Sequence, residues 1–231
     1  MKSIATLITI LICSLLAFGQ ECDTYLLLKE GSSFEYTNFD KKGNPITVGN
    51  HQAVNVENDG NKFTSQIKLD VKDLKKGDTF TMDYDVSCED GVLSIDMSRF
   101  FDSSQLMQYE GADFNIDIEG DMLYFPRDLV EGEELNDGNI TIKVNKDGFT
   151  FVTMTMTVFN RKVLGKESIT TKAGTFDCQK VTYDFESKFG IIKIRGSVEE
   201  WYHDNRLIVK SKTKNKKKKD IGSTELTKVS E

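Results

Sequence analysis

The 231-residue sequence is poor in residue types that carry much of protein chemistry: it has two histidines, four cysteines, two prolines and one tryptophan. His51 and His203 each lie in a polar stretch, and neither fits the spacing of a metal site. No CxxC motif is present to lower a thiol pKa. A glycine-rich phosphate loop and a GxSxG elbow are also absent from the sequence. We therefore expect no catalytic residue, metal ligand or cofactor, and no enzyme.

The scarcity of proline also bears on domain organisation. No linker rich in proline, serine or glycine interrupts the chain, so we expect residues 20–231 to form a single β domain. Residues 1–19 are typical of a secretory signal peptide, since Lys2 precedes an apolar run and a small-residue end at Gly19. The run is too short to span a membrane. Because Glu21 precedes Cys22, we expect no lipid anchor, and predict a soluble exported protein, periplasmic or extracellular.

Acidic residues outnumber basic ones, 37 to 30, which gives a formal charge of −7. Removal of the segment that contains Lys2 would lower this charge further. The balance disfavours nucleic acid, or an anionic membrane, as a general partner. Residues 212–219, with the sequence KTKNKKKK, are the exception and are expected at a hairpin tip. The lysines between Lys214 and Lys219 either prevent edge pairing in a solvated turn or attract phosphate head groups or an acidic polymer.

Alternation of apolar and polar residues dominates the sequence. It is clearest in residues 63–71 and 80–88, where it predicts strands with one solvated face. Asn, Asp and Gly occupy the short connections between strand candidates and favour hairpin turns. We therefore predict an all-β fold, a long antiparallel meander of about ten to thirteen strands curled around an apolar interior. Further strands are expected at residues 33–39, 52–57, 92–97, 113–118, 140–144, 150–159, 191–198, 207–213 and 223–229.

Two segments depart from simple alternation. In residues 165–185, a turn at Ala173 and Gly174 joins two strands, and the apolar phase changes between Cys178 and Val181. Both apolar sets could face one core only if an extra residue lay near Gln179 or Lys180, so we expect a bulge there. Residues 98–111 instead fit a short amphipathic helix that lies against the core.

The cysteines allow one disulfide in an exported protein. Cys13 would leave with the signal peptide, and Cys22, Cys88 and Cys178 would remain. A bond between Cys22 and Cys88 would pin the start of the mature chain to the sheet and leave Cys178 as a buried thiol. We favour this pairing, although spacing alone does not determine connectivity.

Two further features are ambiguous. The acidic residues at 128–137 could gather a calcium ion, but they lack the DxDxDG pattern, and a solvated loop is the preferred interpretation. The alternating methionines in residues 153–157 could fill a core or line an apolar pocket. If the interior binds a ligand, the candidate binding residues are Phe149, Phe151, Met154 and Met156, around a cavity large enough for an acyl chain.

The chain resembles the TapB-like envelope proteins of Gram-negative bacteria, a family of unknown function. The matching positions are Cys22, Gly31, residues 34–36, residues 88–91, Asp96, Met97, Phe125, Pro126, Leu129, Gly132, Leu135, residues 167–171, residues 173–178, residues 200–202 and residues 209–211. The resemblance implies a long antiparallel sheet coiled into an open or partly closed barrel, and no activity. This sequence departs at Lys172, where proline is common, and at residues 205–208, which replace a glycine-containing turn.

These observations leave two functions of different class. The first is a carrier or sensor that holds a lipid or another apolar small molecule inside the curled sheet. The second is an envelope scaffold or accessory protein that acts through surface contacts with an unidentified partner protein.

Overall fold

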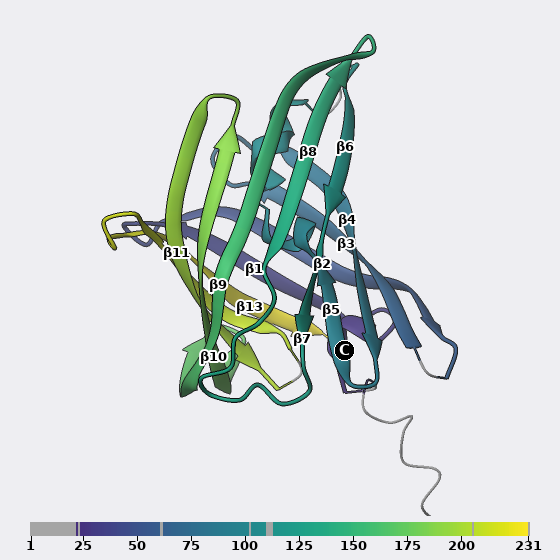
Figure 1. The fold of residues 1–231 in the computed structure, drawn as a ribbon, viewed down its shortest axis with the longest axis vertical. Helices are drawn as coiled ribbons and strands as arrows, with labels where there is room; N and C mark the ends of the chain where they lie inside the picture. The colour runs from purple at the N-terminus through teal and green to yellow at the C-terminus, as the bar shows by residue number, and fades with distance from the viewer. Residues whose placement is uncertain are drawn as a thin grey trace, which may run out of the picture.

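The computed structural model describes residues 22, 24–60, 62–101, 103–109, 113–204 and 206–230. The expected signal peptide, residues 1–19, lies outside them. Within these residues, thirteen antiparallel strands form one sheet (Figure 1), as predicted. The strands are β1 (Ser33–Asp40), β2 (Pro45–Asn58), β3 (Lys62–Asp73), β4 (Thr79–Glu89), β5 (Val92–Asp96), β6 (Asn115–Gly120), β7 (Met122–Phe125), β8 (Gly138–Lys146), β9 (Phe149–Thr171), β10 (Gly174–Phe189), β11 (Ile192–His203), β12 (Ile208–Asn215) and β13 (Asp220–Ser230).

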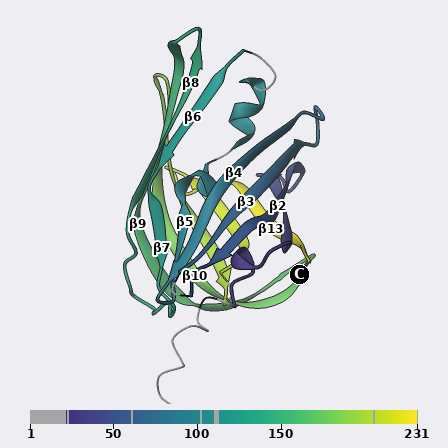
Figure 2. The same ribbon diagram turned by 90° about the vertical axis from the view of Figure 1, so that its right-hand side faces the viewer.

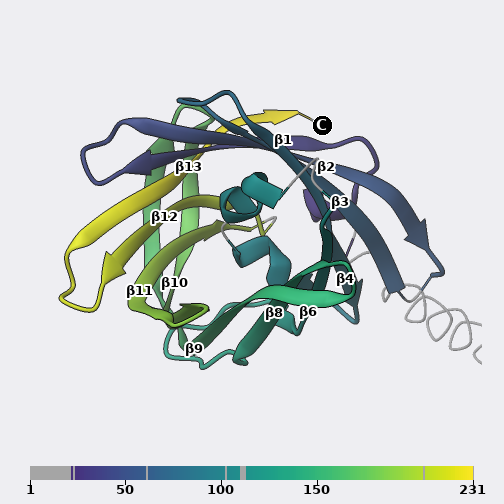
Figure 3. The ribbon, with the colours of Figure 1, turned by 90° about the horizontal axis from the view of Figure 1, so that it is seen from above.

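The sheet is nearly closed, and the first and last strands of the sequence pair with each other within it. β13 pairs with β1 from Ser33↔Ser230 to Asp40↔Gly222. The strand order is β6-β8-β9-β10-β11-β12-β13-β1-β2-β3-β4-β5-β7, with consecutive strands neighbouring almost everywhere. Seen from above, the strands surround the short helices (Figure 3). The sheet therefore has an inner face, which carries the core.

The predicted turns lie between strands. Glycines with positive φ occupy the β1–β2, β3–β4 and β8–β9 turns, at Gly43, Gly77 and Gly148. The left-handed backbone there favours glycine, which has no Cβ. In a meander, successive turns lie at alternate ends of the sheet. These three, together with the β10–β11 and β12–β13 turns, therefore share one end, which we call the upper end.

The β9–β10 pair contains the predicted irregularity, but its cause differs from the prediction. The register shifts between Gln179 and Val181, as expected. The extra residue belongs to β9, however, so β10 keeps its alternation. Cys178 packs with Trp201 and Val209 in a small second cluster, whereas Val181 belongs to the main core. The change of apolar phase therefore reflects two separate clusters on opposite faces, not one core.

The segment expected to be helical forms two 3₁₀ helices, η2 (Met97–Phe100) and η3 (Ser103–Tyr109). The side chain of Asp96 caps η2 by accepting a hydrogen bond from the amide of Ser98, 2.7 Å away. The short helices lie between the two sides of the sheet, which diverge upward (Figure 2). Buried Met97, Phe101 and Leu106 join this segment to the main core, so it fills part of the interior.

A disulfide ties the start of the described chain to the sheet. Cys22 and Cys88 are bonded across a sequence separation of 66 residues, the pairing that the sequence analysis favours. The following helix η1 (Leu26–Leu28) buries all three leucines. This segment packs on β2, β3 and β4.

Candidate functional site

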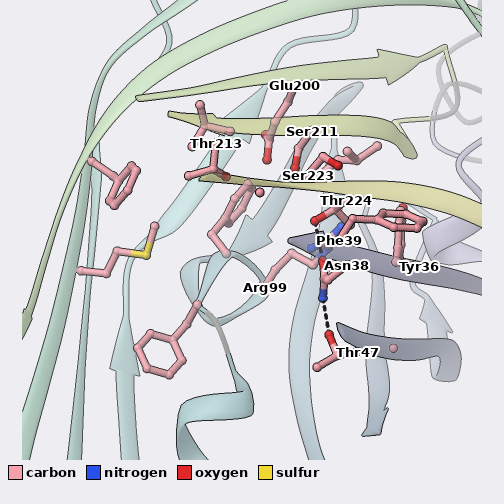
Figure 4. A pocket seen from close by; sticks show the side chains of 18 of the residues that line it. Tyr36, Asn38, Phe39, Thr47, Arg99, Glu200, Ser211, Thr213, Ser223 and Thr224 are labelled. Carbon is pink, nitrogen blue, oxygen red and sulfur yellow. Dashed lines mark hydrogen bonds between the residues drawn. The ribbon is translucent and has the colours of Figure 1, made fainter. Parts of the chain in front are cut away.

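The interior of the sheet contains a cavity of about 450 Å³ (Figure 4). Strands β1–β3 and β9–β13 supply its walls, and η2 and η3 contribute Arg99, Phe100 and Gln105. A volume of this size lies within the ~300–1,000 Å³ typical of small-molecule sites. The interior is therefore not completely filled by its own side chains.

One part of the cavity wall is apolar. The side chains come from strands on both sides of the sheet and from the helical segment, and they include Leu69, Val71, Phe100, Met156, Phe185 and Val198. Val198 and Phe185 are buried in the main core, and Met156 packs against that core. An apolar group placed here would leave water and contact side chains of similar polarity.

A second part of the wall is polar and belongs mainly to β1, β2, β12 and β13 (Figure 4). The amide nitrogen of Asn38 donates to the hydroxyl of Thr47 at 2.7 Å, and the hydroxyl of Thr224 donates to the amide oxygen of Asn38. Ser211 and Thr213 continue this wall on β12. The cavity therefore has two chemical characters, one on each side.

Glu200 is a buried acidic residue on the cavity wall. Its carboxylate accepts hydrogen bonds from the hydroxyls of Tyr183, at 3.0 Å, and Tyr202, at 2.5 Å. Burial raises the pKa of Glu200 above its usual value, although the Tyr202 hydrogen bond and the charge of Arg99 oppose this shift. Burial beside this carboxyl also raises the pKa values of both tyrosines. Glu200 therefore obtains its donors from within the protein.

Arg99 brings a positive charge to the cavity. Its guanidinium lies over the ring of Tyr36, 5.1 Å from the centroid, and 6.0 Å from that of Phe100. Although burial alone lowers the Arg99 pKa, the neighbouring Tyr84, Tyr36 and Glu200 raise it above the usual value. Of the described residues that line the cavity, Arg99 is the one lysine or arginine.

His51 forms part of an aromatic group next to Arg99. Its ring stacks on Phe34 with centroids 5.4 Å apart, and Nδ1 lies 3.0 Å from the hydroxyl of Tyr84. Burial and the charge of Arg99 hold the pKa of His51 well below its usual value. The histidine is therefore neutral near pH 7, and it lines the cavity.

The four predicted binding residues occupy three different environments. Met156 lines the cavity, whereas Met154 is 1% exposed and packed in the core. Phe149 and Phe151 are 77% and 67% exposed, and the ring of Phe151 contacts those of Tyr109 and Phe114. The structure thus places Met156 on the wall and the two phenylalanines near the upper end of β9.

Sequence reasoning missed Arg99 and Glu200. A signal for Glu200 exists, because it shares the inward phase of β11 with Val198 and Tyr202. A charged residue in an apolar phase indicates a buried charge. Arg99 carries no comparable signal, since a 3₁₀ helix of four residues has no clear periodicity.

Cys178 is the buried free thiol among the described cysteines. Burial raises the pKa of Cys178 to about 12, with a contribution from Asp177 and Asp204, so its thiol is unreactive at neutral pH. In the described parts of the chain, no group of three or more His, Cys, Asp or Glu side chains is placed to hold a metal ion. No helix there combines the length and apolar character needed to cross a membrane.

The fold recurs in two solved structures. A protein from Bacteroides fragilis NCTC 9343, described as exported and as having a YmcC-like fold, has a TM-score of 0.75 and 22% identity; the match covers 88% of this chain and 97% of that one. A protein from Parabacteroides distasonis ATCC 8503, described as a lipoprotein, has a TM-score of 0.75 and 21% identity, with coverages of 88% and 96%. Among curated proteins, none matches this sequence. Residues 29–226 match the DUF3108-like family, and the chain belongs to that family.

Proposed function

We propose that this protein is a non-enzymatic exported carrier or sensor that holds a single-chain amphiphile inside its curled sheet. The observation that carries the proposal is the 450 Å³ cavity, whose apolar wall faces a polar wall containing Arg99. Lipid-like molecules combine these two characters. The TapB-like resemblance, the signal peptide and a periplasmic or extracellular location remain predictions that agree with this role.

The apolar part of the ligand would pack against Met156 and its neighbours. Methionine suits such a wall because its flexible thioether adapts to chains of different shape. Each methylene group transferred from water contributes about 0.8 kcal/mol. The cavity therefore favours a flexible apolar chain over a compact polar solute.

The polar end of the ligand would face Arg99. Glu200 already accepts two phenolic hydrogen bonds. The Arg99 guanidinium has five N–H donors, more than its neighbours Tyr36 and Tyr84 take up, and a guanidinium binds carboxylate or phosphate in a bidentate manner. The hydroxyls of Ser211 and Thr213 lie on the same polar wall. An anionic head group fits this end of the cavity better than a cationic one.

Calorimetry with dodecanoate and dodecanol tests the proposal, because the two probes share a chain and differ in charge. We expect the wild-type protein to bind dodecanoate at least about tenfold more tightly than dodecanol, because dodecanoate can form one charge-assisted hydrogen bond with Arg99. Arg99→Gln should remove this preference and retain dodecanol binding. Met156→Trp should weaken both probes by filling the cavity.

Tyr124→Ala is the matched control, since it removes an exposed aromatic side chain that does not line the cavity and should leave both affinities unchanged. Native mass spectrometry of protein purified from the exported fraction should also detect a bound amphiphile. If the wild-type protein bound neither probe, or if Met156→Trp bound both probes as tightly as the wild type, the carrier function would be contradicted. The alternative, an envelope scaffold that acts through surface contacts, would then be favoured.

A further inference from the structure

The two ends of the sheet differ in charge. Each of the five hairpin ends at the upper end carries lysine: Lys41 and Lys42, Lys75 and Lys76, Lys146, Lys188 and Lys193, and residues 216–219. The opposite end carries Asp59, Asp90, Asp204 and the acidic loop of residues 128–134. The net charge of −7 therefore does not exclude a local excess of lysine at the upper end.

Three adjacent hairpin ends form the largest part of the basic end, and we call them the basic rim: residues 41–46, 188–195 and 216–221. They are neighbours because β11 pairs with β12 and β13 pairs with β1. In Figure 1 the β10–β11 hairpin projects at the upper left and the yellow β12–β13 hairpin lies below it. The lysines predicted at a hairpin tip thus belong to a larger surface.

The basic rim also exposes apolar side chains. Ile191, in the β10–β11 turn, is fully exposed at 102%, and Ile46, Ile192, Ile194 and Ile221 are also exposed. Isoleucine is among the residues most often buried in soluble proteins. Five exposed isoleucines at neighbouring hairpin ends indicate a surface that is covered when the protein works.

The positive charge of the rim is only partly neutralised. Lys188, Lys193 and Arg195 all pair with the single carboxylate of Glu186, at 3.4, 2.7 and 2.7 Å. Lys218 lies 3.7 Å from Asp184, and its neighbours in residues 216–219 are exposed. Positive charge therefore remains beside the exposed isoleucines.

We propose that the basic rim docks on an anionic lipid surface, with Ile191 and its neighbours inserted among the head groups and the lysines paired with lipid phosphates. Surface-bound proteins combine basic and apolar side chains in this way. A protein partner fits less well, since protein interfaces are poor in lysine and rich in aromatic residues, and the rim contains one aromatic residue, Phe189.

The rim also borders the cavity. Ile46, Ile194 and Ile221 are exposed on the rim and also line the cavity. Docking would therefore bring this side of the cavity to the lipid surface. The proposal stands on surface charge and exposure, however, and does not require the cavity to hold a ligand.

Flotation with two kinds of vesicle tests docking: phosphatidylcholine alone, and phosphatidylcholine with about 30 mol% phosphatidylglycerol. We expect the protein, without added ligand, to float with the anionic vesicles at about 50 mM salt and to dissociate at about 500 mM. Replacing all four residues 216–219 by Gln, or Ile191→Asp, should lower binding at least about tenfold.

Val130→Asp is the matched control, because Val130 is 60% exposed in the acidic loop. It should bind vesicles like the wild type. The proposal would be overturned if the protein bound neutral and anionic vesicles equally, or if the rim variants bound anionic vesicles as tightly as the wild type. It would also be overturned if the protein did not bind vesicles but self-associated through a contact that Ile191→Asp abolishes. The rim variants should still bind dodecanoate, so failure of docking and failure of the carrier function are distinguishable.

Discussion

Single buried residues determine the electrostatic state of the cavity. Glu200 accepts two phenolic hydrogen bonds, Arg99 lies over an aromatic ring, and His51 stacks within an aromatic group. Each polar side chain is thus matched by neighbours that offset part of its desolvation cost. Burial moves the pKa of Glu200 upward and that of His51 downward, and both shifts favour the uncharged form.

His51 should make stability depend on pH. Because its pKa is lowered in the folded protein, the unfolded chain binds a proton first as the pH falls. The contribution of neutral His51 to the free energy of unfolding is therefore fully present above about pH 6.5. Below that value the free energy of unfolding falls by at most about 1.4 kcal/mol per pH unit. Urea unfolding at pH 7.5 and 5.0 should show a smaller loss for His51→Gln than for the wild type.

Tyr84→Phe provides the control for this prediction. It removes the hydroxyl that lies 3.0 Å from Nδ1 of His51 but keeps the histidine buried. Stability should fall by about 1 kcal/mol at both pH values, and the pH dependence should persist. Equal pH dependence in His51→Gln and the wild type would show that another group is responsible.

At the scale of elements, close strand packing at Gly196 shapes the cavity wall. A Cβ added there would clash with the backbone oxygen of Lys214 and lie 2.6 Å from the ring of Phe185, which lines the cavity. Gly196→Ala should therefore destabilise the protein by about 1–3 kcal/mol, measured by urea unfolding. It should also weaken dodecanoate binding, because Phe185 must move.

Gly165→Ala is the matched control within a strand. The nearest atom to an added Cβ is a carboxylate oxygen of Glu131, at 3.6 Å, an ordinary contact. The urea concentration at the midpoint of unfolding should be close to that of the wild type. A similar loss in both variants would indicate a general cost of alanine in these strands, not crowding at Gly196.

Elements were easier to predict than the site. Alternation in residues 63–71 and 80–88 depends only on local sequence, and β3 and β4 appear where it predicts them. Arg99 and Glu200 meet only because β11 and η2 face each other across the interior, an arrangement that no local pattern encodes. Phe149 and Phe151 lie near the upper end of β9 because this strand, 23 residues long, extends its first residues beyond the core.

For the whole molecule, closure of the sheet depends on a change of partner within one segment. β6 pairs with β8 and β7 pairs with β5. Between them, the amide of Asp121 donates to the backbone oxygen of Asn139 at 2.8 Å. This continuous segment joins the two edges of the sheet. Beyond this hydrogen bond, β7 and β8 do not pair through their backbones, and a side chain supplies the hydrogen bonds to β7 instead.

Asn136 supplies that side chain. Its amide oxygen accepts from the backbone amide of Tyr124 at 2.8 Å, and its amide nitrogen donates to the backbone oxygen of Met122 at 3.0 Å. It therefore occupies the hydrogen-bonding positions of a neighbouring strand. Arg161 holds it in place by donating to its backbone and side-chain oxygens, at 2.8 and 3.1 Å.

Removing this amide should open the sheet locally. In Asn136→Ala, the backbone groups of Met122 and Tyr124 lose their partners, so hydrogen exchange at the Tyr124 amide should accelerate at least about fivefold, as loss of about 1 kcal/mol implies. Asn58→Ala is the control, since it removes a side-chain bond to Gly60 in a turn far from β7. If exchange at Tyr124 stayed slow in Asn136→Ala, closure would depend on β5 pairing and the Asp121 bend alone, and Asn136 would be dispensable for it.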